Sequence, residues 1–135
     1  MVLYHIKGYK IKTKIFSGVQ ILAGLMLVVF GANKFLHFIP MGAPAPAMGA
    51  FMGALFGVGY LMSLVAVIEI AAGLSFLSNK FAPLMSVVLM PVMLNAFLAH
   101  LFLDPSGIGG ALVLTLFTII IMIRHREAYR LLLRA

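Results

Sequence analysis

Apolar residues run along this chain in four long stretches, Ile15–Phe35, Gly53–Leu77, Ala82–Leu103 and Ile108–Ile123. Runs of roughly 20 apolar residues are long enough to cross the hydrocarbon core of a bilayer as helices. Helices are expected because lipid offers no water to unpaired backbone groups. A transmembrane β-barrel would need short alternating segments, which the sequence lacks. The pattern therefore predicts an all-α integral membrane protein built as an antiparallel bundle of four transmembrane helices.

Three breaks separate the four stretches. The first, Pro40–Met52, is rich in proline and glycine, which oppose a continuous helix. The second is the short turn Ser78–Lys80, and the third is the turn sequence DPSG at Asp104–Gly107. Such short connections predict that the last three spans are antiparallel neighbours.

The breaks define one transmembrane domain, residues 15–123, between two basic ends. Residues 1–14 form a basic N-terminal segment, and residues 124–135 form a basic tail. The tail places Arg126, Arg130 and Arg134 at helical spacing beside leucines. We expect it to be a short amphipathic helix that touches anionic lipid headgroups, with a tail that frays into water as the alternative.

Composition supports a lipid environment. The 135 residues are 64% hydrophobic and 10% charged, whereas about 25% of an average globular chain is charged. The formal net charge is +7, which could suggest nucleic acid as a partner. Its basic residues lie at the ends of apolar runs, however, so we expect the lipid bilayer and no nucleic acid as the partner. The absence of cysteine excludes disulfides, thiolate metal sites and dithiol chemistry from this chain, and we predict no metal site.

The distribution of charge predicts the orientation. In a four-span arrangement all basic Lys and Arg residues except Lys34 lie on one side of the membrane. The positive-inside rule then places both termini in the cytoplasm, in a multi-pass protein of the cell (inner) membrane.

Polar residues on the first span predict a site. At 100° per residue, one face of this helix carries Gln20, Gly24, Leu27, Gly31 and Lys34. Small residues mark the side where transmembrane helices approach closely. Lys34 therefore shares its face with the expected packing seam. The alternative is that Lys34 extends outward to headgroups.

Two further polar residues follow at the outer end of this span. Asn33 points away from the seam and is expected to be an end cap or a loop anchor. His37 is expected at the outer rim.

Glu69 is the most informative residue of the second span. Ala66, Ala72 and Gly73 share its face. A carboxylate in a membrane span is costly unless it is neutral, paired or close to water. The alternative to a functional role is a protonated glutamate that hydrogen-bonds a neighbouring helix. Glu69 is predicted deep, toward the cytoplasmic half. A direct pair with Lys34 is therefore expected to be too long, unless the second span starts later than Gly53.

The third span adds Asn95 and His100, and Asp104 follows in the turn. His100 and Asp104 are four residues apart, so the carboxylate can orient the imidazole if the helix continues that far. The same two residues could instead be an outer cap in water. Asn95 and Glu69 could share a pocket, which we predict to be bounded by Lys34, Glu69, Asn95 and His100.

Short motifs in these spans resemble the DoxX-like family of membrane proteins. The motifs are GANKFLHF at the end of the first span, EIAAGL in the second, N-x4-H in the third and FLDPSG after it. The resemblance covers about residues 15–130 and implies a four-helix transmembrane bundle. Members are linked to quinol-dependent oxidation of sulfur compounds, to membrane oxidoreductase complexes in oxidative stress and to assembly of other membrane proteins. The polar positions that match are Asn33, Lys34, His37, Glu69, Asn95, His100 and Asp104.

The resemblance favours a subunit of a membrane oxidoreductase system, with quinone as the possible cofactor and an electron-carrying partner subunit. Glu69 and His100 are its candidate catalytic residues. The candidate ligand-binding residues are Lys34, Asn95, His37, Asp104, Gln20 and Asn33.

Two alternatives stay open at this point. One is a small-molecule or lipid binding or transport protein, which could form a homo-oligomer through Gly53 and Gly57. The other is an assembly factor without chemistry. The lack of cysteine argues against a thiol-exchange role.

Overall fold

Five α-helices and two short 3-10 turns make up the described chain in this computed structural model. The backbone is described for residues 2–130 and 132–133, and side chains for 13–130 and 132–133. No strand occurs in these ranges. The elements are α1 (Val2–Leu36), α2 (Pro46–Gly57), α3 (Leu61–Ser78), α4 (Ala82–Leu103), η1 (Pro105–Gly107), α5 (Ile108–Arg124) and η2 (Arg126–Tyr129).

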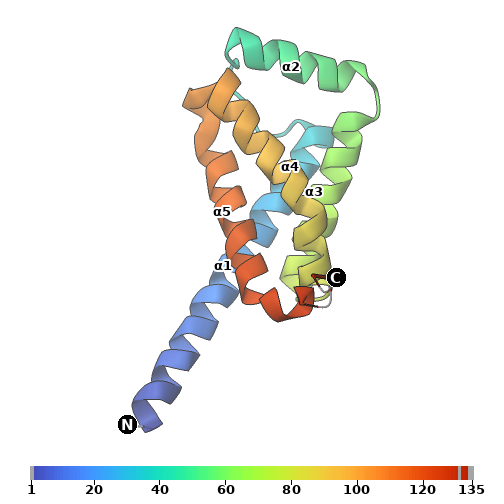
Figure 1. Cartoon of the computed structure of the whole chain (residues 1–135). Coiled ribbons are helices and arrows are strands. Elements are labelled where there is room, and N and C mark those ends of the chain that lie inside the picture. Colours follow the sequence, from blue (N-terminus) through green and yellow to red (C-terminus); the bar gives the residue numbers. More distant parts are fainter. Residues whose placement is uncertain (1, 131, 134–135) are drawn as a thin grey trace.

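Four segments are long and apolar enough to cross a membrane: Thr13–Leu36, Leu61–Ser78, Ala82–Leu103 and Pro105–Arg124. They lie side by side as an upright bundle, with α2 across its upper end (Figure 1). The predicted all-helical bundle with four apolar spans is confirmed. Length and composition of these helices indicate a membrane protein.

The predicted second span, Gly53–Leu77, is wrong at its start. The chain forms α2 first, turns at Gly57–Tyr60 and begins α3 only at Leu61. Gly59 has φ 86°, a left-handed conformation that glycine adopts without steric cost and that separates the two helices.

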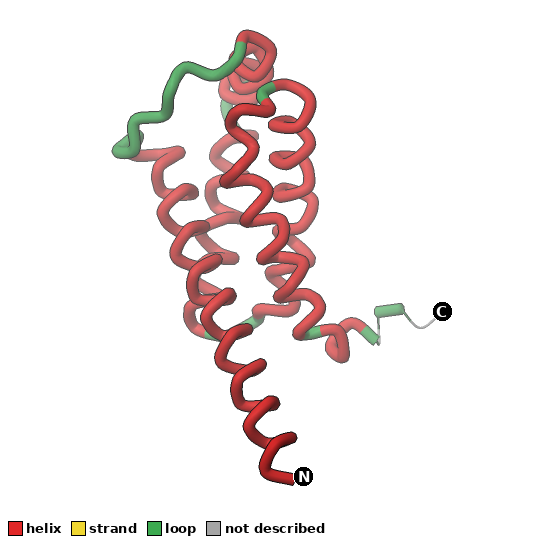
Figure 2. Tube along the Cα trace, turned by 90° about the vertical axis from the view of Figure 1, so that its left-hand side faces the viewer, coloured by secondary structure: helices red, strands yellow, loops and turns green. Residues whose placement is uncertain are grey.

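The proline-rich break before the second span is also more helical than expected. Pro46 stands in the first turn of α2, where its missing N–H costs no hydrogen bond, so it starts a helix there. The remaining loop between α1 and α2 runs over the upper end of the bundle (Figure 2).

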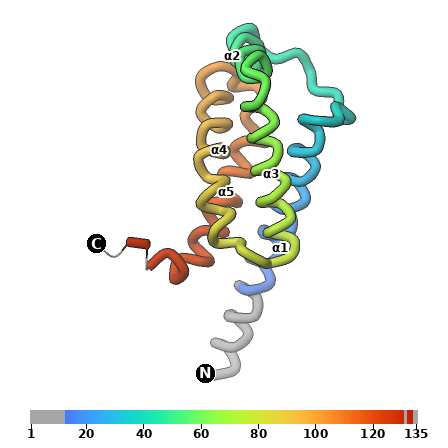
Figure 3. The backbone as a smooth tube through the Cα atoms, turned by 90° about the vertical axis from the view of Figure 1, so that its right-hand side faces the viewer, coloured from blue at the N-terminus to red at the C-terminus, as the bar shows by residue number. Residues whose placement is uncertain are grey.

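The two tight turns are confirmed. Asn79 closes α3 in the left-handed conformation, with φ 53°. Asp104 follows α4, and η1 leads directly into α5. The spans α3, α4 and α5 are consequently antiparallel neighbours (Figure 3).

The basic tail does not continue as an α-helix. Helix α5 ends at Arg124, and η2 folds back beneath α4. The Tyr129 hydroxyl lies 2.8 Å from the Ser86 hydroxyl and donates to the Pro83 carbonyl at 3.0 Å. The predicted amphipathic helix is therefore replaced by a short anchored turn, while Arg134 lies outside the described residues.

The closest packing in the bundle is between α1 and α3. A Cβ added to Gly24 would lie 2.9 Å from the Gly73 carbonyl oxygen, and one added to Gly31 would lie 3.0 Å from the Ala66 carbonyl oxygen. Leu27 is fully buried between these glycines. The predicted packing face of the first span is confirmed, because only residues without side chains let two helix backbones approach this closely.

Candidate functional site

Lys34 of α1 and Glu69 of α3 form an ion pair inside the bundle. The Lys34 Nζ and Glu69 Oε2 atoms are 2.5 Å apart. The Glu69 side chain is 7% exposed and the Lys34 side chain 24% exposed. The glutamate end of the pair is thus buried, and the lysine end is partly exposed.

The expectation that this pair would be too long is wrong, and the start of α3 explains why. Because α3 begins at Leu61, Glu69 lies about two turns, or about 12 Å, below the upper end of its helix. A start at Gly53 would have placed it roughly twice as deep. Lys34 turns inward to reach Glu69, so it does not extend to outer headgroups.

The glycine seam brings the two side chains together. A Cβ on Gly31 would lie 3.2 Å from the Glu69 Cβ, so Gly31 and Glu69 stand at the same level. Lys34 is on the same face of α1, less than one turn above Gly31. Ala66, beside Glu69 on α3, is fully buried and leaves room for the lysine chain.

Glu69 is the only acidic residue within the four long apolar segments of the described chain. A charge in the hydrocarbon region is costly and is normally paired or functional. Lys34 is its only hydrogen-bond partner among the described residues. This pair can hold a polar group of a ligand, by donating from the ammonium group, and can accept or release a proton at the carboxylate.

Asp104 joins the turn after α4 to the start of α2. One carboxylate oxygen accepts a hydrogen bond from the Ser106 hydroxyl at 2.5 Å, and the other accepts one from the Ala45 backbone N–H at 3.3 Å. The Ser106 hydroxyl and then the Ala45 N–H lower the pKa of the Asp104 carboxyl below its ordinary value. Asp104 therefore acts as a structural staple at the upper end.

Asp104 makes no hydrogen bond to the His100 imidazole, although α4 does continue past His100. The buried Nδ1 atom of His100 has no partner among the described side chains and backbone. The predicted orientation of the His100 imidazole by a hydrogen bond to Asp104 is not formed, and the alternative of an outer cap describes Asp104 better.

Asn33 anchors the loop after α1. Its side-chain oxygen accepts a hydrogen bond from the Ile39 backbone N–H at 2.7 Å, as the interpretation of a loop anchor predicts. His37 is exposed and has φ 51°, so it serves the turn out of the helix. The structure brings neither side chain into the Lys34–Glu69 pair.

The predicted pocket bounded by Lys34, Glu69, Asn95 and His100 is not formed as expected. Asn95 is exposed on α4, with no hydrogen bond among the described residues. Two depressions of the described surface lie at the opposite, lower end, and none of these four residues lines either of them.

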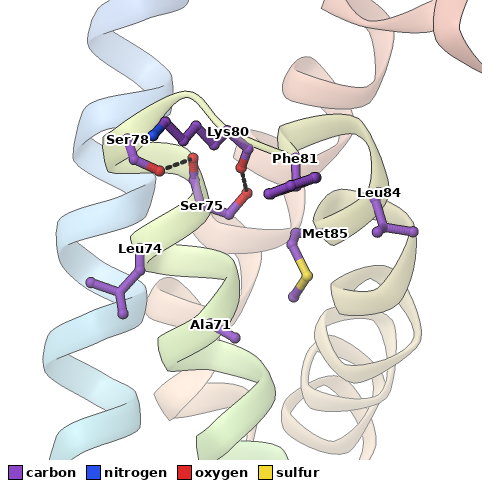
Figure 4. Close-up of a pocket in the computed structure, with 8 residues that line it drawn as sticks. All are labelled: Ala71, Leu74, Ser75, Ser78, Lys80, Phe81, Leu84 and Met85. Carbon is purple, nitrogen blue, oxygen red and sulfur yellow. Dashed lines mark hydrogen bonds between the residues drawn. The ribbon is translucent and has the colours of Figure 1, made fainter.

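The larger depression, of about 490 Å³, lies between the end of α3 and the start of α4. Figure 4 shows Phe81, Leu84 and Met85 along its α4 side, while the Ser75 hydroxyl donates to the Lys80 carbonyl across the turn. Phe81 and Leu84 are strongly exposed. Its walls are mainly apolar and open outward, as expected of a surface against acyl chains.

Gln20 belongs to a separate cluster at the lower end. Its Nε2 donates to the Phe76 carbonyl at 3.0 Å and to the Asn79 side-chain oxygen at 2.9 Å. The Arg124 guanidinium donates to the Gln20 Oε1 at 3.5 Å. Gln20 therefore shares its helix face with Lys34, as predicted, but the two lie near opposite ends of the span.

Sequence reasoning missed Arg124 and Asn79 as members of this cluster. The charge imbalance in the sequence could have pointed to Arg124. Ten Lys and Arg residues face three Asp and Glu residues, so most basic residues have no acidic residue to pair with. Among the described residues no group of three or more His, Asp or Glu side chains is placed to hold a metal ion.

No family model, curated protein or solved structure matches this chain. The resemblance to the DoxX-like family stays a prediction from short motifs.

Proposed function

We propose that this protein is a membrane-embedded subunit of an oxidoreductase system, in which the Lys34–Glu69 pair binds a molecule of the quinone class. The observation that carries the proposal is a paired lysine and glutamate between two spans. A purely structural contact between α1 and α3 does not need them, because the glycine seam already holds these helices together.

The partial exposure of Lys34 makes the pair accessible from outside the bundle, and quinones dissolve in the lipid proposed to surround it. The ammonium group would donate a hydrogen bond to a quinone carbonyl oxygen. In the direction of quinol oxidation, the Glu69 carboxylate would accept one of the two quinol protons, and the second proton would pass to water at the membrane surface. The two electrons would pass to a partner subunit that carries the redox centre.

The experiment measures equilibrium binding of decylubiquinone to the purified full chain in lipid nanodiscs. Glu69→Gln keeps the shape of the side chain and removes its charge. We expect saturable binding to the wild type. Glu69→Gln should bind roughly tenfold more weakly, or weaker still, because a hydrogen-bonded charged group is lost. Glu127→Gln is the matched control, since Glu127 is exposed in η2 and should leave binding unchanged.

A double variant, Lys34→Met with Glu69→Leu, separates binding from folding. Breaking a buried pair on one side destabilises strongly, whereas replacing both partners with apolar groups is often neutral. We expect the double variant to keep the thermal stability of the wild type and to lose quinone binding. Wild-type protein without saturable binding, or a Glu69→Gln variant that binds normally, would contradict the proposal.

An assembly factor is the second candidate, and the exposed glycines of α2 favour it. A Cβ at Gly53 or Gly57 would meet nothing within 4 Å, so this surface could accept a close-packed helix of another membrane protein or of a second copy. Transport is less well supported, because neither Lys34 nor Glu69 lines either of the two depressions at the lower end.

A further inference from the structure

Arg124 stands at the end of α5 and has no acidic partner in the described part of the chain. The chain contains three Asp and Glu residues, and each is engaged elsewhere. Glu69 pairs with Lys34, Asp104 holds the turn at the upper end, and Glu127 pairs with Arg126 and Arg130. The fixed charge of the Arg124 guanidinium is thus not balanced by any side-chain carboxylate of the described residues.

The Arg124 side chain borders a small depression of about 150 Å³ between α1, α3 and α5. Ser17, Gln20 and Asn79 supply the other polar groups of its wall. Gln20 accepts from Arg124 and donates to the Asn79 oxygen, which leaves the Asn79 amide N–H groups without an acceptor among the described residues. Several hydrogen-bond donors therefore surround one space that contains no anion of the chain.

The rest of the wall is apolar. Ile21 and Leu77 line the same depression and are exposed on the outer surface of the bundle. A polar end with a guanidinium and an adjoining apolar flank matches a molecule with an anionic head and an acyl chain.

The charged residues around the depression are positive, as Arg124 is. Lys14 is exposed on α1, one turn below Ser17, and Lys80 follows Asn79 in the turn. Burial and the adjacent Arg124 lower the pKa of the His125 imidazole below its ordinary value, which disfavours a positive charge there. An anion approaching this end therefore meets lysines first and Arg124 at the inner position.

We propose that this depression is a binding site for the phosphate group of an anionic phospholipid, with Arg124 as its main ligand and Gln20 and Asn79 as positioning residues. The acyl chain lies along Ile21 and Leu77. The site is independent of the function proposed for Lys34 and Glu69, which lie in the upper half of the bundle.

Native mass spectrometry of the detergent-purified full chain tests the site, with phosphatidylglycerol, phosphatidylcholine or inorganic phosphate added. We expect phosphatidylglycerol to bind roughly tenfold more tightly than phosphatidylcholine, because its phosphate is not neutralised by a choline ammonium group and meets the uncompensated positive charge of Arg124. Inorganic phosphate at the same concentration should not displace it. If inorganic phosphate binds and displaces the lipid, the site takes a free anion and the lipid assignment is overturned.

Arg124→Gln should remove the preference for phosphatidylglycerol. Arg126→Gln is the matched control, because Arg126 lies two residues after Arg124, carries the same charge and has an exposed side chain. Equal losses in the two variants would mean diffuse attraction and would overturn the site.

A second variant, Asn79→Asp, tests the site independently if Arg124→Gln does not fold. It places a carboxylate beside Gln20 and Arg124 at a left-handed position that aspartate tolerates. This variant should stay folded and lose phosphatidylglycerol binding, since the carboxylate supplies the missing anion from within the chain. Unchanged lipid binding in folded Asn79→Asp would contradict the proposal.

Discussion

At the scale of single residues, the Lys34–Glu69 pair shows how strongly one contact depends on its surroundings. Leaving one partner of such a pair alone in a buried site costs on the order of 3 kcal/mol. Each residue is therefore tolerated in its span only because the other is within 2.5 Å. Both residues were predicted from the sequence, but not their contact. The predicted depth of Glu69 was too great, because it depended on where α3 begins.

Asp104 allows a prediction with a defined pH dependence. Hydrogen bonds from Ser106 and Ala45 lower its pKa in the folded state. Its stabilising contribution is therefore complete above the ordinary aspartate pKa of about 3.9 and is lost as the pH falls through the lower, folded value. Asp104→Asn should reduce the thermal midpoint by a few degrees at pH 7.

Thermal unfolding of wild type and Asp104→Asn between pH 7 and pH 3 in detergent checks this expectation. The difference between the two midpoints should shrink at the acidic end, because the wild-type carboxyl becomes protonated there. A difference that stays constant down to pH 3 would show that the carboxylate charge is not what holds the turn.

At the scale of elements, glycine has two different roles in this chain. In α1 and α3 it allows close packing of backbones, which the spacing on the first span predicted. In α2 the regularly spaced glycines face open space within the described chain, so their spacing alone did not identify a packing seam. The distinction depends on which helix lies opposite, and a single sequence does not carry that information.

Substitution of glycine by alanine separates these two roles. At Gly73 the new Cβ would lie 2.8 Å from the Gly24 carbonyl oxygen, and a backbone atom cannot move aside easily. Gly73→Ala should therefore destabilise the protein by about 1–3 kcal/mol.

Gly53→Ala is the matched control, because its Cβ meets nothing within 4 Å and alanine favours helix by up to about 1 kcal/mol. Thermal or denaturant unfolding in detergent measures both variants. Equal destabilisation by both substitutions would contradict the close approach of α1 and α3. Normal stability with lost cellular function in Gly53→Ala would instead favour a partner on α2.

At the scale of the whole molecule, the two ends of the bundle differ in chemistry. The lower end contains Lys80, Arg124 and η2, and the upper end is covered by the loop after α1 and by α2. No charged residue occurs between positions 38 and 68, so this cover is apolar throughout. The asymmetry is consistent with the predicted cytoplasmic location of the basic lower end.

The natural absence of cysteine makes this orientation directly testable. Single cysteines are introduced at Met41, exposed at the upper end, and at Ala128, exposed in η2. In intact cells a membrane-impermeant maleimide should label Met41→Cys, and it should label Ala128→Cys only after permeabilisation. The cysteine-free wild type controls for background. The opposite pattern would invert the orientation, and equal labelling at both positions would contradict the four-span arrangement.

The sequence by itself determined the helical class, the four apolar spans, the tight turns and the packing face of the first span. These follow from local rules, because backbone hydrogen bonding in lipid, residue type in turns and helical periodicity act over a few residues. Only the tertiary structure decided that α2 is separate from α3, that Lys34 reaches Glu69, that Asn95 stays exposed and that Arg124 meets Gln20. Each of these depends on the relative height and rotation of helices far apart in the chain, and those are set by packing across the whole bundle.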